Sequence, residues 1–73
     1  MLQITVTLSA NQRKVMEDIR RLEHEGVAAI IQEDPPTLIL DVPDHRNEEK
    51  VISALAGFAR KGFVTEFRSR WIK

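Results

Sequence analysis

Residues 27–42 read VAAIIQEDPPTLILDV, and this stretch decides the fold. Two apolar runs rich in β-branched residues, 27–32 and 37–42, flank a polar segment that contains two adjacent prolines. Because proline has no backbone N–H to donate to a strand ladder, residues 33–36 are predicted to form a turn. A connection this short makes the two runs an antiparallel hairpin of strands.

The hairpin is flanked on each side by one helix pattern and one strand pattern. Upstream, residues 2–8 alternate between apolar and polar side chains, as in a strand with one buried face. A helical stripe follows and ends at Gly26, and a second stripe after the hairpin ends at Gly62. Residues 63–71 form the last predicted strand. The two stripes consist of Val15, Met16, Ile19 and Leu22, and of Val51, Ile52, Leu55, Phe58 and Ala59.

This element order, βαββαβ, predicts an α+β fold. Two right-handed βαβ crossovers joined by a hairpin give a four-stranded antiparallel sheet of order 4-1-3-2 with both helices on one face, the ferredoxin-like sandwich. The pattern accounts for all of residues 1–73 and predicts that they form a single domain. A domain this small buries only about 60% of its unfolded surface, so an oligomer interface would add useful stability.

Composition excludes several classes of function. The chain has no cysteine, so disulfides, thiolate metal sites and thiol nucleophiles are absent. No apolar run reaches the roughly 20 residues that span a bilayer, and the amino-terminal strand lacks the basic region of a signal peptide. We therefore expect a cytoplasmic protein with no membrane partner. Eleven basic and eleven acidic residues balance overall, but residues 46–73 carry seven basic against three acidic side chains.

No catalytic constellation or metal site is expected. His24 lies between Glu23 and Glu25 on a helix, and adjacent helical residues do not face a common point. His45 lies in the loop before the second helix. The chain has no glycine-rich phosphate loop and no serine set beside a histidine and an acid. We therefore predict a non-enzymatic protein without catalytic residues, metal or cofactor.

With both helices on one face, the other face of the sheet should be open. Strand alternation predicts that this face carries a partly apolar set of side chains, which we expect to mediate homodimerisation. An alternative is pairing through the edge strand at residues 27–31, which carries no charge. A solvated face, or a surface for a protein, peptide or small ligand, also remains open. The predicted interface residues are Thr5, Thr7, Ala28, Ile30, Ile39 and Val64.

RNA is a further alternative partner, because open four-stranded sheets can stack bases on aromatic side chains. Arg68 and Arg70 are candidates to contact an anionic ligand such as a phosphate. Phe67 and Trp71, however, fall on predicted core-facing or terminal positions. Nucleic acid therefore ranks behind protein and small-ligand partners.

By element order and patterning, nearly the whole chain resembles the ACT domains, a family of small regulatory domains. The stretches that carry the resemblance are ITVTL at residues 4–8, residues 19–22 with the following Gly26-Val27, and residues 51–67. The resemblance implies binding of amino acids or other small effectors between paired domains. ACT domains use an acidic residue and a glycine after the first strand. Here that turn reads SANQ, and Asn11 is the one residue carried over as a contact.

The chain is also similar in element order to the small chaperones that bind the signal peptide of periplasmic nitrate reductase. That resemblance implies a peptide bound at the sheet. Together these observations predict a regulatory or adaptor domain that dimerises and binds a protein or small ligand. A peptide-binding chaperone and an RNA-binding sheet are the alternatives.

Overall fold

The computed structural model describes residues 1–9 and 12–72. The described residues form strands and helices in the predicted βαββαβ order, with one short 3-10 helix before the second α-helix. The elements are β1 (Leu2–Leu8), α1 (Gln12–His24), β2 (Ala29–Asp34), β3 (Thr37–Val42), η1 (His45–Asn47), α2 (Glu48–Arg60) and β4 (Val64–Trp71).

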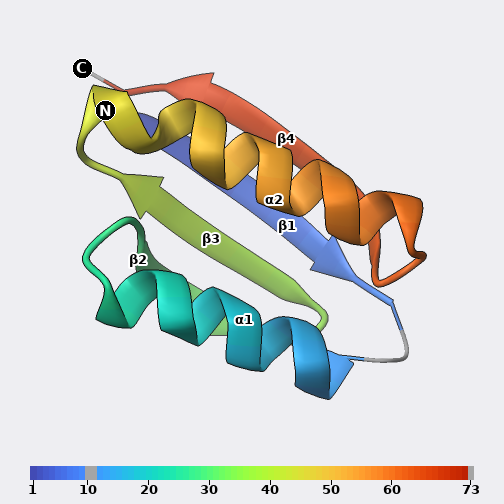
Figure 1. Ribbon diagram of the computed structural model, residues 1–73. Coiled ribbons are helices and arrows are strands. Elements are labelled where there is room, and N and C mark those ends of the chain that lie inside the picture. The colour runs from blue at the N-terminus through green and yellow to red at the C-terminus, as the bar shows by residue number, and fades with distance from the viewer. Residues whose placement is uncertain (10–11, 73) are drawn as a thin grey trace.

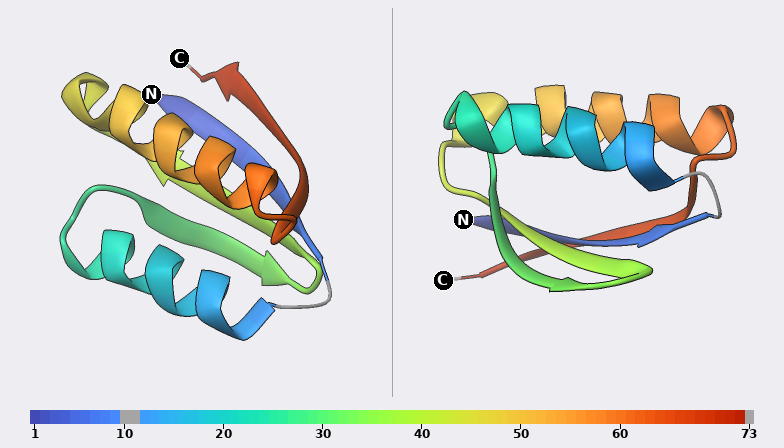
Figure 2. Two further views of the ribbon diagram at one scale, coloured as in Figure 1. Left: turned by 45° about the vertical axis from the view of Figure 1, so that its right-hand side comes forward. Right: turned by 90° about the horizontal axis from the view of Figure 1, so that it is seen from below.

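The strands form one antiparallel sheet in the order β2-β3-β1-β4, which is the predicted 4-1-3-2 order counted from the opposite edge. Figure 1 shows α2 running along β1 and β4, and α1 beside β2. In the right-hand view of Figure 2, both helices form one layer and the strands form the other. The predicted α+β sandwich with an open antiparallel sheet is confirmed, and it is compatible with a ferredoxin-like fold.

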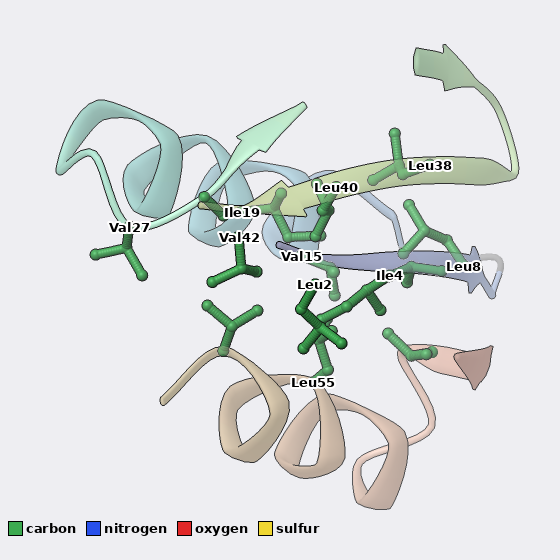
Figure 3. Packing of buried hydrophobic residues seen from close by; sticks show 14 residues of the cluster. Leu2, Ile4, Leu8, Val15, Ile19, Val27, Leu38, Leu40, Val42 and Leu55 are labelled. Carbon is green, nitrogen blue, oxygen red and sulfur yellow. The ribbon is translucent and has the colours of Figure 1, made fainter. Parts of the chain in front are cut away.

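The core is entirely aliphatic. Side chains from β1, β3 and both helices point into one interior (Figure 3). All four aromatic side chains remain partly buried or exposed instead, and they belong to the segment between Phe58 and Trp71. The buried cluster consists of Leu2, Ile4, Val6, Leu8, Val15, Ile19, Val27, Ala28, Leu38, Leu40, Val42, Val51, Leu55 and Val64.

A β-bulge in β2 corrects the predicted position of Ile30. Gln32 pairs with Ile39, but Ile30 pairs with Leu40, so Ile31 is an extra residue between the two pairs. Directly opposed residues share a face of the sheet, so Ile30 faces the core with Leu40 and packs against it. The prediction that Ile30 lies on the open face is wrong. Without the bulge, Ile30 would have paired with Asp41.

Val64 and Ala28 were also predicted on the open face, and both predictions are wrong. A second bulge lies where β4 begins, because Leu8 pairs with Val64 whereas Thr7 pairs with Glu66. The extra residue turns Val64 into the core, where it is 3% exposed. Ala28 precedes β2, so strand alternation does not govern it, and it is buried beneath the end of α1.

The predicted helix ends are confirmed at both glycines. Gly26 and Gly62 have φ angles of 77° and 80°, the left-handed conformation that glycine adopts without a steric penalty. At the start of the second helix, the Asp44 carboxylate accepts the backbone N–H of Arg46 and caps η1. Asn47 is the residue before α2, and its side chain forms no capping bond.

Candidate functional site

The open face of the sheet is more polar than the sequence predicts. Of the predicted interface residues, Thr5, Thr7 and Ile39 do lie on this face, each partly buried by its neighbours. The other three face the core, so they add no apolar surface to the open face. The side chains on the open face over the three strands β3, β1 and β4 are Thr37, Ile39, Asp41, Gln3, Thr5, Thr7, Glu66, Arg68 and Arg70.

A row of hydrogen bonds crosses the open face from β4 to β3. Arg70 Nε donates to Gln3 Oε1 at 3.3 Å, and Gln3 Nε2 donates to Asp41 Oδ1 at 3.2 Å. Arginine only donates and an ionised aspartate only accepts, so the Gln3 amide has one orientation that satisfies both neighbours. The row therefore holds the guanidinium of Arg70 over the sheet.

The next row along the strands is less polar. Thr5 pairs with Ile39 on one side and with Arg68 on the other. Arg68 forms an ion pair with the Glu66 carboxylate through its Nε. Between these two rows lies a shallow hollow of about 470 Å³. It is lined by Gln3, Thr5, Ile39, Arg68, Ser69 and Arg70. The structure thus places Arg68 and Arg70, the predicted anion contacts, in one site.

The β2 edge of the sheet is protected, contrary to the prediction from its lack of charge. The Glu23 carboxylate on α1 accepts the backbone N–H of Ile30 at 2.9 Å. Arg20 also pairs with Glu33 at 3.0 Å, which joins α1 to the far end of β2. The Glu23 bond uses one outward backbone group, and the bulge at Ile31 distorts the ladder that a second strand would need.

We expect Glu23→Ala to destabilise the fold by about 1 kcal/mol and to increase self-association through β2, because the Ile30 N–H loses its acceptor. Urea unfolding and light scattering measure the two effects. Glu25→Ala is the matched control, since the Glu25 side chain makes no such bond in the described part of the chain. Equal behaviour of both variants would contradict the protective role.

The β4 edge, on the opposite side of the sheet, is open. Met1 and Ile72 exchange both backbone hydrogen bonds, at 3.2 and 2.8 Å. Such pairs alternate along an antiparallel ladder, so the backbone groups of Arg68 and Arg70 face β1. Those of Phe67 and Ser69 therefore point outward. In the described ranges 1–9 and 12–72, no side chain bonds to these outward groups.

Aromatic side chains line the same edge. Phe67 and Trp71 lie on the helix-facing side of β4, opposite Val6 and Leu2 of β1. Phe63 immediately precedes the strand, and Trp71 is 66% exposed with its ring 6.4 Å from that of His45. None of these rings lies on the open face, where base stacking would require them. Aromatic residues are enriched at protein interfaces.

The titratable groups at the start of α2 form two local pairs. His45 Nδ1 lies 2.8 Å from Glu48 Oε1, and Glu48 is nearly buried in the first turn of α2. The side-chain hydrogen bond from Arg46 holds the pKa of Asp44 below its ordinary value. Across residues 1–9 and 12–72, no group of three or more His, Asp or Glu side chains could hold a metal ion.

Within the described ranges, neither α1 nor α2 is sufficiently long and apolar to cross a membrane. Asn11, the contact carried over from the ACT resemblance, lies outside the described residues.

Comparison of the chain with protein-family models, curated proteins and solved structures finds no match in any of the three.

Proposed function

We propose that this protein is a non-enzymatic regulatory or adaptor domain that works as a homodimer, joined by antiparallel pairing of the β4 edges. The observation that carries the proposal is the unpaired β4 edge, which combines outward backbone groups with a rim of aromatic side chains. The opposite edge is protected by Glu23. Three of the six predicted interface residues, Ala28, Ile30 and Val64, face the core instead of the open face, so the open face is the weaker candidate for self-association.

The register of the two β4 strands follows from which backbone groups point outward and from the charges of Glu66 and Arg68. Phe67 has outward backbone groups, so it can form a hydrogen-bonded pair with its own copy on the two-fold axis. Glu66 then lies opposite Arg68 of the second copy, and both such pairs are attractive. A shift that puts Arg68 opposite itself preserves the hydrogen bonds but opposes two like charges directly. The Phe67-centred register is therefore favoured.

The same register also brings two aromatic side chains together. Phe67 meets its own copy on the helix side of the sheet, the side on which Trp71 of each copy also lies. Burial of these rings adds apolar contact to the strand hydrogen bonds, and aromatic pairs add about 0.5–1.5 kcal/mol beyond area burial. The product is a continuous eight-stranded sheet with all four helices on one side. Its other side stays open for a protein or small ligand, in keeping with the ACT-like role.

Sedimentation velocity combined with hydrogen exchange tests this proposal. At tens of micromolar we expect a species with twice the mass of one chain. The backbone amides of Phe67 and Ser69 should exchange more slowly as concentration rises, because pairing occupies these outward groups. The amide of Gln32 in β2 is the internal reference and should not change. A monomer throughout this range, or a doubled mass without protection of the Phe67 and Ser69 amides, would contradict the β4 dimer.

A further inference from the structure

The hollow on the open face combines a fixed cation with an apolar floor. Arg70 is held by a neutral partner, Gln3, and no carboxylate among the described residues lies within ion-pair distance of it. Only its Nε is used by that hydrogen bond. The terminal nitrogens of the guanidinium therefore keep donors for a ligand, and they form a planar fork that suits a carboxylate.

The floor beside Arg70 is suited to a short apolar group. Thr5 and Ile39 are paired across β1 and β3, and both are partly buried and line the hollow. Its volume of about 470 Å³ is in the range of small-molecule sites, which run from roughly 300 to 1,000 Å³. A ligand that places its anionic end on Arg70 would extend its body over these two side chains.

The charges around the hollow favour a single negative charge. Arg68, the second cation in the lining, is already paired with Glu66, and Asp41 lies at the far end of the Gln3 row. One uncompensated guanidinium matches a monoanion with two oxygens, whereas a phosphate dianion would need a second free cation. We propose that the open face binds a small organic acid, with its carboxylate on Arg70 and its apolar body over Thr5 and Ile39.

This site goes beyond the proposed dimer and does not depend on it. Pairing through β4 uses the outward backbone groups of that strand and leaves the hollow accessible. Association through the open face would instead cover it. The ligand and the dimer can therefore be tested separately on the same sample.

Hexanoate is the probe, followed by NMR at the Arg70 Nε–Hε group and at the methyl groups of Thr5 and Ile39. We expect saturable shifts at all three positions. Hexanol lacks the carboxylate charge and acetate lacks the alkyl chain, so both should bind at least about tenfold more weakly than hexanoate. Inorganic phosphate should not produce the methyl shifts.

Arg70→Gln should weaken hexanoate binding at least about tenfold, since it removes the charged fork while keeping a polar side chain. Arg60→Gln is the matched control, because Arg60 is an exposed arginine at the end of α2 in the helix layer. Shifts that do not saturate, equal binding of phosphate, or equal loss in both variants would overturn the site. Sedimentation of the same samples reports the dimer independently. A monomer that binds hexanoate would therefore contradict the proposed dimer but not the proposed ligand site.

Discussion

Val64→Asp should unfold much of the protein under conditions in which Ile39→Asp remains folded. Val64 is buried against Leu8, so an aspartate there must bury its carboxyl group without a partner or open the start of β4. Burial of an unpaired polar or charged group is among the few single changes that cost about 4 kcal/mol or more. A domain of this size has little more than that to lose.

Ile39→Asp is the informative comparison, because uninterrupted strand alternation would place Val64 and Ile39 on the same face. Ile39 lies on the open face, where a carboxylate stays hydrated, and we expect a loss of about 1 kcal/mol. Urea unfolding followed by circular dichroism measures both. If Val64→Asp is too unstable to purify, Val64→Thr keeps the shape and should still cost more than Ile39→Thr. Equal costs at the two positions would contradict the bulge in β4.

Charge reversal at the proposed dimer interface should have the second large effect. Glu66→Arg places an arginine opposite Arg68 of the second copy, twice in each dimer because of the two-fold axis. Attraction becomes repulsion at both sites, so we expect the dissociation constant to rise by about tenfold or more. Arg68→Glu should act equally, since it places Glu66 opposite a glutamate.

The double variant Glu66→Arg with Arg68→Glu restores opposite charges across the axis and should recover most of the dimer. Sedimentation equilibrium gives the three dissociation constants. Arg13→Glu on α1 is the control for a general change in net charge, because Arg13 is exposed in the helix layer. A double variant as weak as either single one would rule out the proposed register, although not another pairing through β4.

Most of the architecture follows from local patterns in the sequence. The apolar runs around Pro35 and Pro36 predict the hairpin, and the glycines at 26 and 62 predict where the helices end. The right-handed crossover rule then leaves one strand order, which the structure has. Each of these signals is carried by residues close together in the chain, so neighbouring residues are sufficient to interpret them.

The composition of the open face could not be predicted in the same way, because it depends on register between distant strands. A single extra residue in β2 moves Ile30 from the open face to the core, and another in β4 moves Val64. Neither bulge contains glycine or any other local signal. The cap on the β2 edge depends on how α1 lies against β2, since Glu23 reaches the Ile30 N–H from the helix. The Arg70–Gln3–Asp41 row spans three strands.

The position of β1 in the middle of the sheet constrains how the protein can be made. Both neighbours of β1 follow it in the chain, and β4 comes after every other element. A ribosome therefore releases this strand well before either hydrogen-bonding partner exists. During synthesis its apolar face can be covered first by α1 and then by α2, and its second edge is paired once residues 64–71 have emerged. Native structure should consequently form only after residues 64–71 have been synthesised, because β4 must then pair with β1 at the other end of the described elements.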